Sequence, residues 1–328
     1  MGDSGFRWGM ELVPAAPIDQ LIDRAQAAQA AGVEALFVSS HFDNRDPFTV
    51  AALLLEATES VHIGPGVVNP YERHPVTMAS QVATLSEIAP GRVHLGNRPR
   101  TICRVLGQLG LADRRDLRSV LEAFEVARQL WDGEALDHDG RFLARDVALN
   151  YPVEATIPVY VGGEGPHMCR MAGKRADGLL FNGSHPADLR WAREQFDIGR
   201  RARDAAAVDS RLYAYASVSV DTDAAAARDA ARPPVAYISA GAAPPVLQRH
   251  GIDEAAVTEI ESALAAGEHA AAFERVTADM LDAFSIAGAP ASVAAQLEAV
   301  CEHEHGVVLG APLGPTPLAA IDLLAELL

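Results

Sequence analysis

Lysine, cysteine and long apolar runs are all scarce in this sequence, and each shortage excludes a class of protein. Lys174 is the only lysine among 27 basic residues, and 44 acidic residues bring the net charge to −17 at pH 7. An acidic surface repels phosphates, so nucleic acid is excluded as a partner. No apolar run reaches the roughly 18 residues of a membrane-spanning helix, and no secretory signal pattern opens the chain.

The cysteines and histidines lack the spacing of a metal site. Cys103, Cys169 and Cys301 lie far apart, which fits neither a metal site nor a disulfide framework, and no His-x-x-x-His pair occurs on one helix. We therefore expect no metal and a reducing, cytoplasmic location. Much acid with little lysine is typical of a halophilic protein, because high salt screens charge repulsion. A high-GC genome, which favours Ala and Arg over Lys, gives the same composition.

Short apolar stretches alternate with stretches of helical spacing along the whole chain. Eight strands are predicted, at residues 6–13, 35–38, 61–68, 92–96, 158–162, 178–181, 212–220 and 306–310. The pattern predicts an α/β fold, a (β/α)8 TIM barrel formed by residues 1–328 as a single domain. An open doubly wound sheet has the same periodicity, but the count of eight and the lack of an early Gly-x-Gly-x-x-Gly favour the barrel.

An Ala-rich helical region at about 223–285 separates the last two predicted strands. Pro233-Pro234 and Pro244-Pro245 interrupt it, and proline inside a helix removes a hydrogen bond and clashes with the preceding turn. The region is therefore expected to be a helical insertion between strands seven and eight, broken at both proline pairs.

Polar residues follow the predicted strands, and the carboxyl ends of barrel strands form the active-site face. Glu11 stands near the end of strand one. Two interpretations are open: an ion-pair partner of Arg45 or Arg73, or a general acid whose pKa is raised by burial. No Gly-x-Ser-x-Gly elbow indicates a serine hydrolase, and Ser184 is expected to hydrogen-bond a cofactor.

A glycine-rich loop at residues 162–166 precedes a predicted helix. Unpaired N–H groups at a helix N-terminus bind anions. We expect Gly162, Gly163 and Gly165 to hold the phosphate of a nucleotide-like cofactor, although an ordinary glycine turn has the same sequence. The spacing is not that of a Walker P-loop.

Residues 61–68 form a short apolar strand that contains two glycines, Gly64 and Gly66, which indicates a bulge or a close approach of another group. Residues 64–75 resemble the third-strand motif of the deazaflavin-dependent branch of the luciferase-like barrels. Within that branch they are most similar to the 5,10-methylenetetrahydromethanopterin reductases, which use coenzyme F420. Residues 161–168, 176–183 and 286–290 are similar to further segments of the same family.

The resemblance implies a hydride transfer between F420 and the one-carbon unit of a small-molecule pterin or folate. FMN is the alternative cofactor. It implies a cis peptide at Gly66–Val67, Glu11 as the proton donor to a pterin nitrogen, and a homodimer or larger homo-oligomer. Besides the glycine loop, it implies cofactor contacts at His41, Gly64, Gly66, Val67, Asn69, Gly96, Asn182 and Gly183.

Two positions depart from the family pattern. Ser40 stands where the family has an Asp before the histidine, and residues 97–100 read Asn97-Arg98-Pro99-Arg100 where the family has small residues. Bulky cations therefore replace residues that let a ring approach. This departure keeps three alternatives open: an F420-dependent alcohol dehydrogenase, an FMN monooxygenase, and a non-catalytic paralogue that retains the barrel.

Overall fold

The computed structural model describes residues 5–41, 43–98, 110, 117–203, 209–302 and 304–328. The barrel strands are β1 (Trp8–Leu12), β2 (Ala35–Val38), β3 (His62–Pro65), β4 (Leu95–Asn97), β7 (Val159–Gly162), β8 (Gly178–Asn182), β9 (Arg211–Val220) and β11 (Gly306–Leu313). They lie side by side in the order β3-β2-β1-β11-β9-β8-β7-β4, all parallel. Isolated parallel bridges, Ile63 to Val93 and Val68 to Asn97, close the ring. The predicted (β/α)8 barrel is confirmed.

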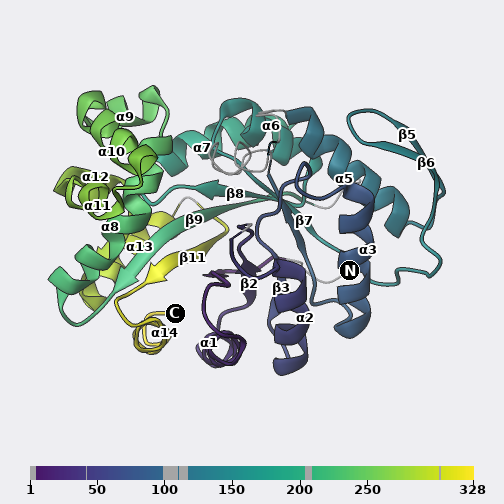
Figure 1. Ribbon diagram of the computed structural model, residues 1–328, viewed down its shortest axis with the longest axis horizontal. Coiled ribbons are helices and arrows are strands. Elements are labelled where there is room, and N and C mark those ends of the chain that lie inside the picture. The colour runs from purple at the N-terminus through teal and green to yellow at the C-terminus, as the bar shows by residue number, and fades with distance from the viewer. Residues whose placement is uncertain (1–4, 42, 99–109, 111–116, 204–208, 303) are drawn as a thin grey trace.

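Helices cover the outside of the barrel (Figure 1). They are α1 (Ile18–Ala30), α2 (Pro47–Ala57), α3 (Pro75–Ile88), α5 (Leu117–Trp131), α6 (Pro166–Arg175), α7 (Pro186–Arg200), α13 (Pro290–Cys301) and α14 (Pro317–Ala325). Among the residues that the structure describes, no helix is both long and apolar enough to cross a membrane.

Three of these helices begin at a proline whose preceding side chain caps the helix. Asp46 accepts a hydrogen bond from the N–H of Thr49 at 2.9 Å, and His74 Nδ1 and His185 Nδ1 accept from the second helical N–H at 3.3 and 3.1 Å. Proline has no N–H to leave unpaired at the first helical position, and the cap satisfies one of the free donors that follow. The polar residues at these strand ends therefore fix where the chain turns into each helix.

Strand residues alternate between two cores, because successive side chains of a strand point to opposite faces. Leu36 and Val38 of β2 pack outward against the helices, whereas Ala35 and Phe37 pack inside the barrel. The same alternation on the other strands fixes which residues point into the barrel.

The predicted helical insertion lies between β9 and β11. It contains α8 (Ala224–Gly241), α9 (Pro244–His250), α10 (Glu254–Ala266), α11 (His269–Glu274), α12 (Ala278–Phe284) and a short strand, β10 (Ile286–Gly288), which pairs with β9. Figure 1 shows these helices at one end of the molecule and the antiparallel hairpin of β5 (Leu136–Asp139) and β6 (Leu143–Val147) at the other.

The expected break at Pro233-Pro234 is wrong. Helix α8 runs through both prolines, and the chain leaves the helix only at Ala242, before Pro244. The neighbouring Ala231, Val235 and Ala236 are buried in the insertion's own apolar core. Packing of this face holds the helix together despite the two hydrogen bonds that the prolines cannot donate.

A buried ion pair fastens the insertion to the barrel. Asp188 of α7 accepts a hydrogen bond from Arg249 and lies 2.7 Å from His250 Nε2, both at the end of α9. The Asp188 side chain is 6% exposed and that of His250 is 7% exposed. Because the Asp188 carboxylate is almost inaccessible to water, it depends on these two partners, which fix the position of α9 against α7.

Asp188→Asn is expected to lower the free energy of unfolding by up to about 3 kcal/mol, because Arg249 loses its buried counter-charge. The matched control is Asp282→Asn, which removes a pair with Arg228 whose acidic partner is 65% exposed; it should cost less than about 1 kcal/mol. Chemical denaturation, with hydrogen exchange to follow α9, measures both. Equal losses in the two variants would contradict the role of Asp188.

Candidate active site

A layer of aromatic rings fills the inside of the barrel. Phe6, Phe37, Tyr160 and Tyr213 pack together with Ala35, Leu180 and Val308, and the Phe6 and Tyr213 rings stack with centroids 4.0 Å apart. The next inward-facing position on each strand therefore lies at the carboxyl end of the barrel. These positions are Glu11, Ser39, Gly66, Gly96, Gly162, Asn182, Tyr215 and Gly310. Five of them are predicted site residues, which the fold brings into one layer.

Glu11 is held by hydrogen bonds from two neighbouring strands. Ser39 Oγ donates to Oε1 at 2.5 Å, and the backbone N–H of Ala311 donates to Oε2 at 2.9 Å. The proposed ion pairs with Arg45 and Arg73 are wrong, because Arg45 bonds to backbone carbonyls of the loop after β1 and Arg73 pairs with Asp46 at 2.6 Å. The carboxyl is therefore fixed in direction by neutral donors.

Tyr215 is a site residue that the sequence analysis missed. Its hydroxyl donates to the Gly66 carbonyl at 3.4 Å. Burial, the charge of Glu11 and a hydrogen bond to Glu11 raise the pKa of Tyr215 well above its usual value, while Arg98 and Ser39 act in the opposite direction. The alternation of residues 211–220 could have identified Tyr215 from the sequence, since it places Tyr213, Tyr215 and Ser217 on one face of the strand.

The chain after β3 carries the expected cis peptide at Gly66–Val67. A Cβ on Gly66 would lie 2.4 Å from Phe37 Cβ, so only glycine fits above the aromatic layer. A Cβ on Gly96 would lie 2.9 Å from one Val67 methyl carbon, which is too close, and a Cβ on Gly162 would be in contact with the other at 3.4 Å. Because the Val67 side chain packs against these glycines, the backbone of the bulge at residues 66–67 faces the open carboxyl end of the barrel.

Gly64 lies one layer deeper than the other glycines. A Cβ there would be 2.0 Å from the His94 carbonyl oxygen. Packing against this strand neighbour accounts for the glycine.

The remaining predicted cofactor contacts lie on the loops at this end. His41 is half-buried after β2, and Asn69 is buried with its Oδ1 accepting from the N–H of Tyr71 at 2.8 Å. Asn182 is exposed and donates to Glu164 at 3.0 Å, and Gly183 packs against the Phe181 ring. The expected cofactor contact of Ser184 is not supported, because its buried hydroxyl bonds to the Phe284 carbonyl and the Ser217 N–H, each at 3.2 Å.

The glycine loop leads into α6 as predicted, but its glycines differ in their surroundings. The N–H of Gly163 donates to the Leu180 carbonyl at 3.2 Å, and a Cβ on Gly163 would lie 2.1 Å from Met168. Gly165 is the N-cap of α6, without a side-chain cap, and a Cβ there would meet nothing within 4 Å. An anion therefore has room beside Gly165 and the first turn of α6, not at Gly163.

Arg98 stands at the edge of this layer. Its N–H donates to the Val68 carbonyl at 3.0 Å, and its Cβ lies 3.3 Å from where a Gly162 Cβ would be. The predicted departures Pro99 and Arg100, like Cys103, lie outside the described residues. Among the residues described, no group of three His, Cys, Asp or Glu side chains is placed to hold a metal ion.

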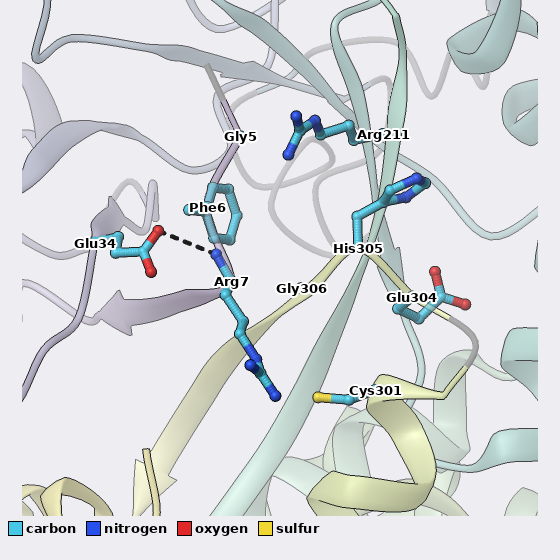
Figure 2. A pocket seen from close by; sticks show the side chains of 9 residues that line it. All are labelled: Gly5, Phe6, Arg7, Glu34, Arg211, Cys301, Glu304, His305 and Gly306. Atoms are coloured by element: carbon cyan, nitrogen blue, oxygen red, sulfur yellow. Dashed lines mark hydrogen bonds between the residues drawn. The ribbon is translucent and has the colours of Figure 1, made fainter. Parts of the chain in front are cut away.

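Two cavities lie at the opposite, amino-terminal end of the barrel. Figure 2 shows the larger one, about 420 Å³, with Arg7 pointing toward Cys301 and Arg211 on the far side. A second cavity, about 300 Å³, adjoins it beside His62 and His94. Conserved barrel chemistry is carried at the carboxyl ends of strands, so we place the candidate site around Glu11.

Glu304, beside the larger cavity, has a side chain that is 0% exposed and lies 3.3 Å from Arg193. Burial raises the pKa of Glu304 to about 9; Arg193 lowers it and Asp197 raises it further. Its Oε1 has no hydrogen-bond partner among the described residues. The carboxyl is therefore neutral near pH 7, and it belongs to the packing between α7 and β11.

The sequence and the fold agree on a family. The model of the luciferase-like monooxygenase family matches residues 4–307, so the chain belongs to this family. A 5,10-methylenetetrahydromethanopterin reductase of Archaeoglobus fulgidus is 34% identical over 98% of each chain, and that of Methanolobus tindarius is 35% identical over 97% of this chain and 98% of the relative. The structure of the coenzyme F420-dependent tetrahydromethanopterin reductase from Methanopyrus kandleri matches with a TM-score of 0.89 and 30% identity, over 98% of this chain and 97% of that one.

Glu304→Gln is expected to stabilise the protein increasingly as the pH rises. Between the ordinary pKa of 4.5 and the raised value of about 9, the folded state keeps a proton that the unfolded state releases. Stability of the parent therefore falls across this window, whereas glutamine does not titrate. Thermal unfolding from pH 5 to 9 measures the difference, with the exposed Glu302→Gln as control. Parallel curves for the parent and Glu304→Gln would contradict the burial argument.

Proposed function

We propose that this protein transfers a hydride between reduced coenzyme F420 and a methylene-tetrahydropterin, tetrahydromethanopterin or tetrahydrofolate, in one-carbon metabolism. The observation that carries the proposal is the Glu11 carboxyl, held by Ser39 and Ala311 beside the strand-three bulge. Its support is similarity over nearly the whole chain to 5,10-methylenetetrahydromethanopterin reductases. The pterin or folate is a small-molecule substrate.

The residues present fit a flat, phosphate-bearing cofactor. Val67 packs over Gly96 and Gly162, which leaves the backbone of the bulge as a shelf without a projecting side chain. The N-terminus of α6 at Gly165 has room for a phosphate and the dipole to attract it. Gly66 and Val67 would support the ring and the first turn of α6 would hold the phosphate, with contacts from His41, Asn69, Asn182 and Gly183 at the rim. When bound, reduced F420 supplies the hydride.

Glu11 acts as the general acid in this proposal. A methylene bridge between two nitrogens opens when one nitrogen is protonated, which gives the iminium that accepts the hydride. Ser39 and Ala311 fix both carboxyl oxygens, so the acid keeps one orientation toward the bulge. General acid help of this kind is worth about 10²–10⁴-fold in rate.

Arg98 favours a second candidate, the F420-dependent oxidation of an alcohol. Its position beside Gly162 and the bulge narrows the space for a large substrate. A smaller substrate needs less of that space. In this oxidation the Glu11 carboxylate would take the hydroxyl proton as a general base, and oxidised F420 would accept the hydride. Assaying a methylene-tetrahydropterin and secondary alcohols side by side separates the two candidates.

Other expectations from the sequence stay predictions. We propose one domain over residues 1–328. The family match to residues 4–307 and the Asp188–His250 contact, which joins the insertion to α7, support it. The cytoplasmic location, the high-salt habitat and the homo-oligomer rest on the sequence alone.

Purified protein is expected to bind F420 more tightly than FMN, and the binding should depend on charge at Gly165. Gly165→Asp places a carboxylate at an N-cap, where it stabilises α6 but repels a phosphate. Gly165→Asn caps the same helix without charge. Isothermal titration should give a Kd for F420 that is at least roughly tenfold higher in the Gly165→Asp variant than in the Gly165→Asn variant. That ratio corresponds to a difference of about 1.4 kcal/mol in binding free energy.

Tighter binding of FMN would instead support a monooxygenase. Equal F420 affinity in the Asp and Asn variants would show that the phosphate lies elsewhere. Gly163 is a poor test position, because a side chain there would collide with Met168.

Glu11→Gln is expected to lower turnover by at least roughly tenfold, with F420 affinity within a few-fold. Glutamine can accept from the N–H of Ala311 and donate to Ser39 Oγ, so the local hydrogen bonds survive. Steady-state kinetics and thermal unfolding of one preparation measure both effects. A lower melting temperature with unchanged turnover per folded molecule would make Glu11 a structural residue.

A further inference from the structure

The smaller of the two cavities at the amino-terminal end, about 300 Å³, reaches the underside of the aromatic layer. Phe6 and Tyr160 of that layer line it, together with Ala35 of β2 and the buried Val61. An apolar cavity of about 150 Å³ is large enough to hold benzene. The space beneath the layer is therefore large enough for a small aromatic molecule.

His94 brings a buried ring nitrogen to the wall of this cavity. The residue is 1% exposed, and it faces the inside of the barrel because its neighbour Leu95 packs in the outer core. Its Nε2 has no hydrogen-bond partner among the described residues. A buried polar atom without a partner costs free energy, so a hydrogen-bonding molecule in the cavity would be stabilised at this nitrogen.

Two aromatic neighbours fix the His94 ring, and burial keeps it neutral. The ring packs against Phe37 with centroids 4.4 Å apart and meets Tyr160 nearly edge-on at 5.5 Å. Burial, with a smaller contribution from His62, lowers the pKa of His94 to about 3, so the imidazole carries no charge at pH 7. A nitrogen of a neutral imidazole either donates or accepts one hydrogen bond, and a hydroxyl group can satisfy both cases.

The remaining polar groups of the cavity favour a ligand without charge. Among the described residues that line it, Glu34 is the one with a formal charge at pH 7, since burial lowers the pKa of His62. Glu34 is exposed at the rim, where its carboxylate repels an anion. The Gln29 side-chain oxygen already accepts from the backbone N–H groups of residues 59 and 60, each at 2.9 Å. The neutral His94 offers a cation no counter-charge at the inner end.

We propose that this cavity binds a phenol, a neutral aromatic ring that carries a hydroxyl group. The ring would lie against Phe6 and Tyr160, and the hydroxyl would form a hydrogen bond with His94 Nε2. Apolar walls favour the ring, and the buried nitrogen selects for the hydroxyl. The site lies at the end of the barrel opposite Glu11, so it is separate from the proposed reductase site.

Phenol itself is the probe, and toluene, which has a similar shape without the hydroxyl, is its control ligand. In an NMR titration, phenol should bind the parent protein with a Kd on the order of a millimolar or below. It should bind roughly fivefold to tenfold more tightly than toluene. His94→Phe keeps an aromatic ring and removes the nitrogen, so it should abolish this preference. His269→Phe, at a half-buried histidine of the helical insertion, should retain it.

A second variant tests the cavity without altering His94. Ala35→Val narrows the cavity from β2 and should weaken the binding of phenol and of toluene alike. The proposal is overturned by equal affinities for phenol and toluene in the parent, or by a preference for phenol that survives His94→Phe. Phenol affinity unchanged by Ala35→Val would overturn it as well. These titrations contain neither F420 nor a pterin, so their outcome is independent of the proposed function.

Discussion

The aromatic layer inside the barrel is the constraint on which the candidate site depends. Phe6, Phe37, Tyr160 and Tyr213 pack against one another inside the barrel. Polar side chains two positions further along each strand therefore have nowhere to go but the carboxyl end. The layer also sets the floor on which Gly66 rests, because Phe37 lies directly beneath it. The aromatic layer therefore supports the candidate site directly, and a substitution in the layer would displace both Glu11 and the bulge at Gly66.

Above this floor, small residues decide where the backbone runs. Glycine at 66, 96 and 162 lets the bulge settle between β2, β4 and β7 with Val67 filling the gap. This packing is in place without a cofactor, so the proposed binding of a cofactor ring would require little movement. Preorganisation of this kind lowers the cost of binding, because the shape is established during folding. Arg98 is the exception, since it brings a long cation to the edge of an otherwise smooth shelf.

Electrostatics around Glu11 differ from those at the rest of the surface. The chain carries a net charge of −17, yet the donors to Glu11 are a hydroxyl and a backbone N–H. Neutral donors orient a carboxyl through hydrogen bonds rather than through an ion pair. Arg45 and Arg73, the two arginines considered as partners, bind elsewhere, Arg45 to the Ala15 carbonyl and Arg73 to Asp46. Hydrogen bonds from Ser39 and Ala311 therefore orient the acid.

The sequence by itself determined the barrel, the insertion, the glycine bulge and the position of Glu11 at the end of strand one, because strand alternation, proline positions and glycines are local signals. Only the tertiary structure decided which polar groups touch. Ser39 and Ala311 lie at the ends of separate strands, and no spacing in the chain shows that they meet at Glu11. Local rules also misplaced a break at Pro233, where burial against the insertion's core outweighs the helix-breaking tendency of proline. Pairing across a closed sheet joins residues hundreds of positions apart, and that information lies in packing rather than in any short motif.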